Sequence, residues 1–371
     1  MTAKIKVIFV AMQTTIVKKD IRSLSLSELE LALVALGEPK FRAKQIFEWL
    51  WVKSSHNFDT MTNLSLELRE KLEDNFVIHA VKVKEQQISN DRTIKSAFQL
   101  HDGFVVEGVL IPTTNRMTAC ISSQVGCSLT CKFCATGKLK RERNLNADEI
   151  YDQVVAIKNQ AEENYKTPLS NIVYMGMGEP LLNYKNVLDS IEKITSPMGL
   201  GMAAKRITVS TAGIAKMIKK LGDDAVRFNL ALSLHAANDT KRNQIMPINE
   251  QNSLEVLAEA LQYFYEKTGT HVTYEYIIFK DFNDSLDDAR ELLAFCQHIP
   301  CKVNIIEYNP IDNGEFKQAD ASKVDAFSSF LERNRVIINI RRSRGKDIDA
   351  ACGQLANKNK VKFNFKVKNH I

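Results

Sequence analysis

The chain has 371 residues and 44% hydrophobic content, enough to bury a large core and to form two or three structural units. Its formal net charge of +6 is compatible with a polyanionic partner, but an ordinary solvated surface would carry the same excess. Seven cysteines, an odd number, argue against a secreted disulfide framework and favour a reducing cytoplasm.

The first 20 residues show little pattern, so we assign this N-terminal extension no structure. Either Met1 or Met12 could be the start of translation. The apolar run Ile5–Met12, interrupted by Lys6, is too short to span a membrane and has no convincing cleavage site. We therefore expect a cytoplasmic protein without a membrane segment.

Residues 21–79 are predicted to form a small helical domain. Apolar residues recur at helical spacing over 28–36, 41–51 and 64–76. Ser27 is expected to cap the first helix and Gly37 to end it. Three basic residues could contact RNA phosphates, although a charged face alone does not establish binding: Arg42, Lys44 and Lys53.

Residues 80–115 alternate apolar and polar side chains, which predicts a β-hairpin or small sheet leading into the next domain. A turn is expected at 101–103, between two of the strands. Glu107 lies inside an apolar strand. Taken alone it reads as the solvent-facing residue of an edge strand, whereas a carboxylate held near a reaction centre could act as a base.

The core domain is predicted over 116–345, where strands alternate with helical patterns. Strands are expected at 117–124, 170–177, 206–211, 227–235, 271–279 and 302–308, with helices between them. Such alternation indicates an α/β fold with a parallel sheet, here a partial (βα)6 barrel of the TIM type. Ligands of such barrels bind at the C-terminal ends of the strands.

The predicted strand ends carry polar groups. Residues 175–180 read MGMGEP, which contains G-x-G but lacks the third glycine of a dinucleotide fingerprint, so we reject that fold. These glycines instead let the backbone approach a ligand closely. Other strand ends offer Ser210, Thr211, Ser233, Leu234, His235 and Asn309. Each is a weak signal alone, but together they favour a polar ligand at one mouth.

Three cysteines in eight residues, Cys127, Cys131 and Cys134, form a C-x3-C-x2-C motif. They can hold three corners of an iron–sulfur cube and leave one iron open to a chelating molecule. This spacing is the signature of radical S-adenosylmethionine enzymes. Structural zinc would need a fourth ligand, and none lies nearby in the sequence. Free buried cysteines do not usually cluster in this way.

Residues 346–371 form a C-terminal segment that carries Cys352 and a tail, from Lys358, of alternating basic and apolar residues. A lone cysteine among small residues is most often a buried filler, as we expect of Cys296 and Cys301. Two basic clusters could line a phosphate-binding rim or simply form solvated faces: Lys138, Lys140, Arg141 and Arg143, and Arg341, Arg342, Arg344 and Lys346.

Six motifs, between about residue 40 and residue 355, resemble one family closely: VEGVLIP, ISSQVGCSLTCKFCATG, MGMGEPLLNY, LALSLHA, IMPIN and DIDAACGQL. The chain is similar to the radical-SAM ribosomal RNA adenine methyltransferases of the RlmN/Cfr family. The resemblance implies that the three motif cysteines hold a [4Fe-4S] cluster. It also implies that S-adenosylmethionine contacts Gly178, Glu179, Ser210, Ser233, Leu234, His235 and Asn309. Glu107 matches the family's acidic active-site residue, a proton acceptor.

The resemblance further implies a radical mechanism that uses two S-adenosylmethionine molecules per turnover. Carbon 2 of adenine is not nucleophilic, so Cys352 would first carry the methyl group and Cys120 would then remove the ring proton. A transient Cys120–Cys352 disulfide would release the product. The implied substrates are 23S rRNA and tRNA, with an electron donor such as flavodoxin and a monomeric enzyme. A relative that methylates C8 and a non-catalytic zinc RNA-binding protein remain the alternatives.

Overall fold

The computed structural model describes residues 18–357, so most of the expected N-terminal extension and the tail from Lys358 lie outside the described residues. The chain divides into two compact units, one ending at His79 and the other beginning at Ala80. No helix within 18–357 is long and apolar enough to cross a membrane.

Over the described residues 18–79, the N-terminal unit has three α-helices, two short 3-10 helices and one two-stranded ladder. The helices are α1 (Leu26–Ala35), α2 (Arg42–Trp51) and α3 (Leu66–Asn75), and the ladder pairs β1 (Lys19–Asp20) with β2 (Phe76–Val77) in parallel. Ser25, not Ser27, caps α1: its side chain accepts from the Glu28 amide, and the Glu28 carboxylate accepts from the Ser25 amide. The expected helix start was therefore two residues late.

The second unit is built on one ten-stranded sheet in the order β14-β13-β12-β11-β10-β9-β6-β5-β4-β3. Its parallel strands are β6 (Arg116–Cys120), β9 (Asn171–Tyr174), β10 (Ile207–Thr211), β11 (Asn229–Ser233), β12 (Val272–Ile278), β13 (Cys301–Glu307) and β14 (Ile337–Arg341). The antiparallel strands are β3 (Lys82–Ile88), β4 (Ile94–Gln99) and β5 (Val105–Thr113).

Two features of this sheet differ from the sequence prediction. β14 is a seventh parallel strand that the sequence does not indicate, because the strand is short, partly exposed and followed directly by basic residues. In addition, β3–β5 do not form a separate hairpin. They continue the barrel sheet beyond β6, and we call them the antiparallel extension.

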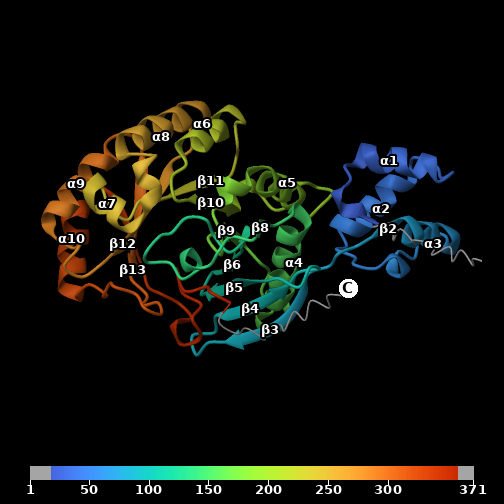
Figure 1. Ribbon diagram of the computed structural model, residues 1–371, viewed down its shortest axis with the longest axis horizontal. Helices are drawn as coiled ribbons and strands as arrows, with labels where there is room; N and C mark the ends of the chain where they lie inside the picture. Colours follow the sequence, from blue (N-terminus) through green and yellow to red (C-terminus); the bar gives the residue numbers. More distant parts are fainter. Residues whose placement is uncertain (1–17, 358–371) are drawn as a thin grey trace, which may run out of the picture. The chain divides into compact units, whose positions relative to one another are not determined.

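Helices cover the outer side of the parallel strands, as Figure 1 shows for α6, α8, α9 and α10. The helices of this unit are α4 (Ala147–Tyr165), α5 (Tyr184–Thr195), α6 (Ala215–Asp223), α7 (Asp239–Ile245), α8 (Leu254–Thr268), α9 (Leu286–Cys296) and α10 (Ala321–Arg333). In α5 the buried positions Val187, Ile191 and Ile194 follow helical spacing. Because these strands run parallel, their carboxyl ends lie along one edge of the sheet and open at one mouth.

Candidate active site

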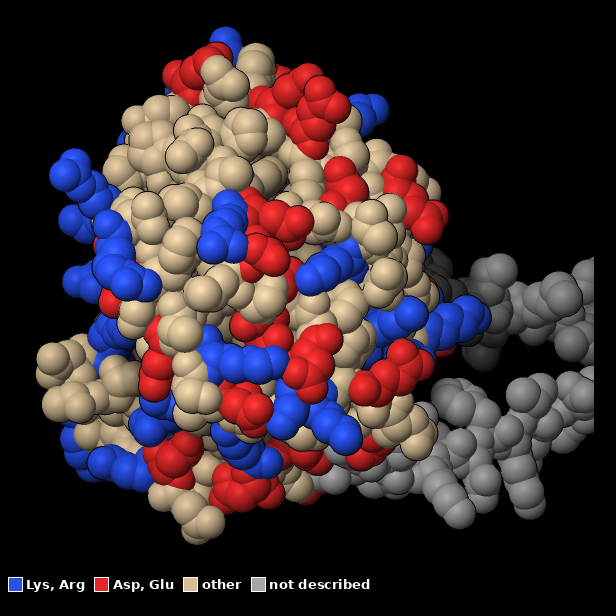
Figure 2. Space-filling model, turned by 90° about the vertical axis from the view of Figure 1, so that its left-hand side faces the viewer, with Lys and Arg blue, Asp and Glu red and all other residues tan. Residues whose placement is uncertain are grey.

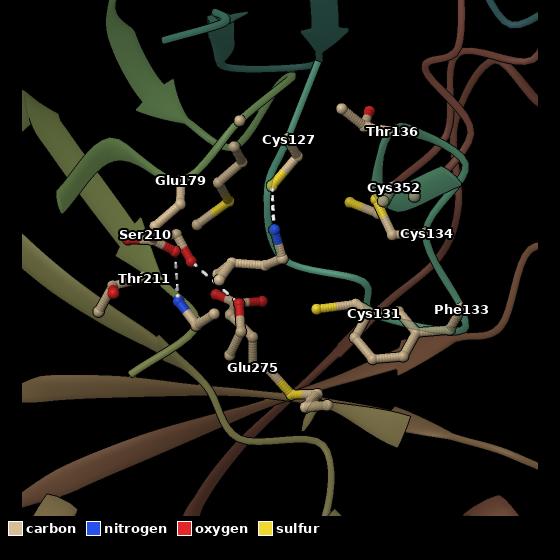
Figure 3. Close-up of a pocket in the computed structure, with 18 of the residues that line it drawn as sticks. Cys127, Cys131, Phe133, Cys134, Thr136, Glu179, Ser210, Thr211, Glu275 and Cys352 are labelled. Carbon is tan, nitrogen blue, oxygen red and sulfur yellow. Dashed lines mark hydrogen bonds between the residues drawn. The ribbon is translucent and has the colours of Figure 1, made fainter. Parts of the chain in front are cut away.

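The cysteine motif lies on one loop whose ends are paired by the short strands β7 (Gln124–Val125) and β8 (Arg143–Asn144). Gly126 begins the loop with φ +74°, and a Cβ there would lie 2.1 Å from the Lys140 carbonyl oxygen, so only glycine fits. Three thiols reach the wall of one cavity (Figure 3): Cys127, Cys131 and Cys134. Burial raises the pKa of each, that of Cys127 to about 11.

Two glycines just beyond β9 let this strand end approach the chain that leads into the cysteine loop. A Cβ on Gly176 would lie 2.7 Å from the Ile121 carbonyl oxygen, and one on Gly178, at φ +97°, would lie 2.5 Å from Gln124 Cβ. The expectation that these glycines allow a close approach to a ligand stays a prediction, and the structure adds a second reason for glycine at both positions. Both line the cavity, but the close approach is to neighbouring backbone and side chain.

Glu179 is buried at the cavity wall and held by backbone donors. One carboxylate oxygen accepts from the Leu181 amide at 3.0 Å and the other from the Ala212 amide at 2.7 Å. Burial raises the pKa of Glu179, and these hydrogen bonds oppose the shift. The side chain thus ties the end of β9 to the end of β10.

Two further strand ends face the same cavity. The Ser210 and Ser233 hydroxyls lie 3.3 Å apart, on neighbouring strands. His235 has φ +56°, and its Nδ1 accepts from the Ile277 amide at 3.1 Å, which leaves Nε2 as the protonated nitrogen. Burial, with Arg242 nearby, lowers the pKa of His235 to about 3, so the ring is neutral. Together these groups offer hydroxyls and an N–H to a polar ligand.

Arg242 is a buried residue of the site that the sequence analysis missed. Its guanidinium donates to the carbonyl oxygens of Ala212 at 2.6 Å, Leu234 at 3.0 Å and Ser233 at 3.1 Å, and also to Asn249. Burial lowers its pKa to about 10, so it stays charged near neutral pH. This one cation fixes the ends of β10 and β11 relative to each other.

A second cavity adjoins the first and carries the other two cysteines of interest. Cys120 ends β6 and is buried, whereas Cys352 lies in a turn and is exposed. Cys352 lines both cavities, and Cys120 lines only the second. Burial, with Cys352 nearby, raises the pKa of Cys120 to about 12, and Arg341 opposes the shift. Residues separated by 232 positions thus meet at one cavity.

Arg341 and Glu275 connect the two cavities. Glu275 was not predicted, and Arg341 was expected only as part of a basic rim or a solvated face. Arg341 Nη1 lies 3.1 Å from Glu275 Oε2, and Asn304 donates to Glu275 Oε1 at 2.7 Å. Glu275 lines the first cavity and Arg341 the second. Burial of the thiol raises the pKa of Cys352, although the residue as a whole is exposed, and Arg341 opposes this shift.

Glu107 is buried, so its interpretation as a solvent-facing edge residue is wrong. It lines neither cavity. Its Oε2 accepts from the amides of Ala356 at 2.8 Å and Asn357 at 3.0 Å, and its Oε1 lies 3.6 Å from Lys95 Nζ. The carboxylate therefore contacts the segment that follows Cys352.

The remaining expected residues also lie near the strand ends. Leu234 is buried behind the first cavity and does not line it. Asn309 donates to the Cys352 carbonyl at 3.2 Å, and its buried Oδ1 has no hydrogen-bond partner among the described residues. Cys296 and Cys301 are half-buried rather than fully buried, and they lie outside both cavities.

Comparisons with known proteins match this architecture. Residues 19–78 match the family described as "Ribosomal RNA large subunit methyltransferase N-terminal domain", and residues 121–295 match the radical SAM superfamily. A "Probable dual-specificity RNA methyltransferase RlmN" from Cytophaga hutchinsonii is 63% identical over 351 residues, which cover 94% of this chain and 96% of that protein. The chain belongs to the RlmN family.

Further relatives extend the RlmN likeness. The "Dual-specificity RNA methyltransferase RlmN" of Geotalea uraniireducens is 44% identical, over 91% of this chain and 96% of that protein. The crystal structure of a radical SAM methyltransferase from Sphaerobacter thermophilus superposes with a TM-score of 0.86 at 37% identity, over 91% of this chain and 99% of that chain. The partial-barrel prediction is thereby confirmed.

Membership of the radical SAM superfamily implies a [4Fe-4S] cluster and S-adenosylmethionine, and the residues present fit both. Within residues 18–357 no three His, Cys, Asp or Glu side chains converge to hold a single metal ion. The three motif thiols instead border one cavity together, as a cube bound at three separate corners requires. Hydroxyl, carboxylate and imidazole groups of the strand ends line the space beside them.

The two basic clusters are mostly engaged within this RlmN-family chain. Arg143 pairs with Asp102 and Glu149, Arg342 and Lys346 pair with Glu307, and Lys138 donates to the Asp312 carbonyl. On the face that carries α9 and α10, Figure 2 shows basic side chains interspersed with acidic ones. Ion pairs there include Lys280–Asp320 and Lys323–Asp281. The charge excess therefore forms no single patch on that face.

Proposed function

We propose that this protein is a radical S-adenosylmethionine methyltransferase that methylates C2 of an adenine in 23S rRNA and in tRNA. RlmN relatives named as dual-specificity RNA methyltransferases support the substrate class. One observation carries the proposal for the mechanism: Cys352 lines both the cavity of the cluster cysteines and the cavity of Cys120. A residue that carries a methyl group between two partners needs this location.

In the proposed enzyme Cys127, Cys131 and Cys134 would hold the cluster, and the chemistry that it would supply when bound is the one-electron cleavage of S-adenosylmethionine to a 5′-deoxyadenosyl radical. The residues that would contact S-adenosylmethionine are Gly178, Glu179, Ser210, Ser233, Leu234, His235 and Asn309. Asn309 lines neither cavity, but its buried Oδ1 has no partner among the described residues, and such an acceptor suits a ligand donor. Neutral His235 would donate from Nε2 and could not repel the sulfonium.

Cys352 would lose its thiol proton and gain a methyl group by displacement from one S-adenosylmethionine. The S-methyl group of Cys352 would then lose one hydrogen atom to the radical from a second molecule, which leaves as 5′-deoxyadenosine, and its carbon would bond to C2. The Cys120 thiolate would take the C2 proton, and one electron would pass from the adduct back to the cluster, so that the ring becomes aromatic again without an external oxidant. After losing that proton to solvent, the Cys120 thiolate would attack the Cys352 sulfur, the carbon–sulfur bond would break, the released carbon would take a proton, and a disulfide would remain that a thiol must reduce with two electrons.

Nucleoside analysis tests this function. The cluster-loaded protein is incubated with S-adenosylmethionine, a reductant and rRNA from a methylation-deficient strain, and the digested RNA is analysed by mass spectrometry. We expect 2-methyladenosine, with one S-adenosylhomocysteine and one 5′-deoxyadenosine formed per methyl group. Formation of 8-methyladenosine would instead assign the C8 activity, and unmodified adenosine would refute the methyltransferase. Flavodoxin as electron donor, the monomeric state and the cytoplasmic location stay predictions.

A further inference from the structure

The segment that carries Cys352 is fastened to the antiparallel extension on its upstream side. The Asp347 carboxylate accepts from the Ser89 hydroxyl at 2.5 Å and from the Asn90 amide at 3.0 Å. In the same turn, the Asp91 carboxylate accepts from the Gly345 amide at 2.9 Å. Two carboxylates therefore hold the chain five to seven residues before the cysteine against the loop between β3 and β4.

The downstream side of the segment is fastened by one buried carboxylate. Glu107, on β5, accepts from the consecutive amides of Ala356 and Asn357. Lys95, on β4, lies 3.6 Å from the other carboxylate oxygen, and the two side chains are 8% and 4% exposed. A charged acceptor makes stronger hydrogen bonds than a neutral one, most of all where water is excluded. This contact is therefore a strong anchor.

Between these anchors the Cys352 turn is held through its carbonyl groups. Asn309 donates to the Cys352 carbonyl, Ala135 to that of Gly353 at 2.7 Å, and Thr136 to that of Leu355 at 2.6 Å. These donors come from the end of β13 and from the cysteine loop. The position of the thiol is thus set by backbone contacts on three sides, while the side chain itself remains exposed.

We propose that Glu107 is a positioning residue for Cys352: its carboxylate, by holding the two amides that follow the turn, sets where the thiol stands relative to Cys120. The inference rests on the proposed function, in which the same thiol must meet S-adenosylmethionine and Cys120 in turn. Both oxygens of Glu107 face protein groups, and the residue borders neither cavity. It therefore acts through Cys352 and does not contact the adenine.

A matched set of variants separates this role from proton transfer. Glu107→Gln keeps the shape of the side chain but removes its charge. Ala356→Pro removes one donor N–H and leaves the carboxylate intact, whereas Ala356→Ser keeps the N–H and serves as the control. Proton transfer by Glu107 would require the carboxylate but not the Ala356 amide. Positioning of the Cys352 thiol requires both the carboxylate and the Ala356 N–H.

The measurement is the equilibrium between Cys120 and Cys352 thiols and their disulfide in cluster-loaded protein. Anaerobic glutathione buffers set the redox poise, because one glutathione disulfide takes two electrons from the thiol pair and yields two glutathione thiols. Alkylation followed by peptide mass spectrometry gives the fraction of the Cys120–Cys352 disulfide. We expect Glu107→Gln and Ala356→Pro each to lower the equilibrium constant about tenfold. Ala356→Ser should match the unsubstituted protein.

The double variant Glu107→Gln/Ala356→Pro guards against general distortion. Because both changes release the same anchor, its disulfide equilibrium should equal that of either single variant. Two results would overturn the proposal. One is an equilibrium constant in the double variant that falls by the product of the two single effects, and the other is an unchanged constant in Glu107→Gln. The readout needs neither RNA nor methyl transfer. A failure of the proposed function would appear separately, as missing 2-methyladenosine from the unsubstituted protein.

Discussion

The parallel strands and the antiparallel extension of the same sheet contribute to the site in different ways. The parallel strands β9–β12 bring residues directly to the first cavity at or just beyond their ends. These residues are Gly178 and Glu179 after β9, Ser210 on β10, Ser233 and His235 at the end of β11, and Glu275 on β12. The extension places no residue of β3 or β4 in either cavity. Its contribution is to hold the backbone of the Cys352 segment through carboxylates.

This difference shows that a residue outside the ladder, such as the proposed methyl carrier Cys352, needs other contacts to fix its position. The end of an inner strand is fixed by hydrogen bonds to the neighbouring strand on each side, so its side chains need no further contacts to hold their position. Cys352 lies after the last strand of the described chain, where no ladder holds it. Contacts with the extension replace the ladder: its Asp91 and Glu107 accept from amides of the Cys352 segment, and Asp347 of that segment accepts from Ser89 and Asn90.

Replacing Cys352 with Ala removes the proposed methyl carrier, which contacts of both the parallel strands and the extension hold in place, and we expect the largest effect from it. Methylation should fall at least about 10³-fold, because a nucleophile that forms a covalent intermediate has no substitute. The iron content and visible absorption of the cluster should not change. Cys296→Ala, which removes a half-buried thiol outside both cavities, is the matched control and should retain full activity. Retention of activity in Cys352→Ala would exclude the methyl carrier.

Replacing Arg242 with Met tests the parallel strands alone. It leaves the carbonyl oxygens of Ala212, Ser233 and Leu234 without their buried donor, which should cost about 3–5 kcal/mol of unfolding free energy. Urea denaturation measures the change. Arg290→Met removes an exposed, locally paired arginine and should stay within about 0.5 kcal/mol. Equal effects of the two variants would contradict the role of Arg242 in fixing β10 and β11.

Replacing Asp347 with Asn tests the extension and should have the smallest effect, which depends on pH. The Ser89 hydroxyl and the Asn90 amide lower the pKa of Asp347. Because the folded pKa lies below the unfolded one, the stabilisation is present above about pH 4 and is lost as the pH falls through the folded value. The denaturation midpoint of Asp347→Asn should therefore be lower than that of the unsubstituted protein at pH 6, and the difference between the two midpoints should close as the pH falls through the lowered pKa of the folded protein.

A second substitution, Ser89→Ala, gives the control for that experiment. It removes the hydroxyl that Asp347 accepts from, so its effect and that of Asp347→Asn should not add in the double variant. If the difference in denaturation midpoint between Asp347→Asn and the unsubstituted protein grew at acid pH, the role of the Asp347 carboxylate as an anchor would be contradicted.

Local patterns, each a few residues long, were enough to predict which loop and which strand ends border the first cavity. The cysteine loop and the strand ends at Gly178, Ser210, Ser233 and His235 all border the first cavity. The cap of α1 was misplaced by two residues because serines alternate there, and only the spacing from Ser25 to Glu28 completes a capping box.

The rest of the site depends on contacts between residues far apart in the sequence. The bond from Ala356 to Glu107 joins positions 249 residues apart, and no local pattern at Glu107 signals that partner. Arg242 reads as an ordinary charged residue of a short helix until its carbonyl acceptors are known. β14 was missed because an exposed edge strand lacks a buried run of apolar residues. Such features follow from tertiary packing rather than from periodicity.

The most direct test of the central claim, that Cys352 carries the carbon that reaches adenine, is to react the Cys120→Ala variant with substrate RNA. Without the thiol that takes the ring proton and cleaves the bridge, the reaction should stop at a covalent enzyme–RNA adduct. Peptide mass spectrometry should then find Cys352 joined through one CH2 group to C2 of an adenine. Release of methylated adenine without any adduct, or a cross-link at another residue, would contradict the account.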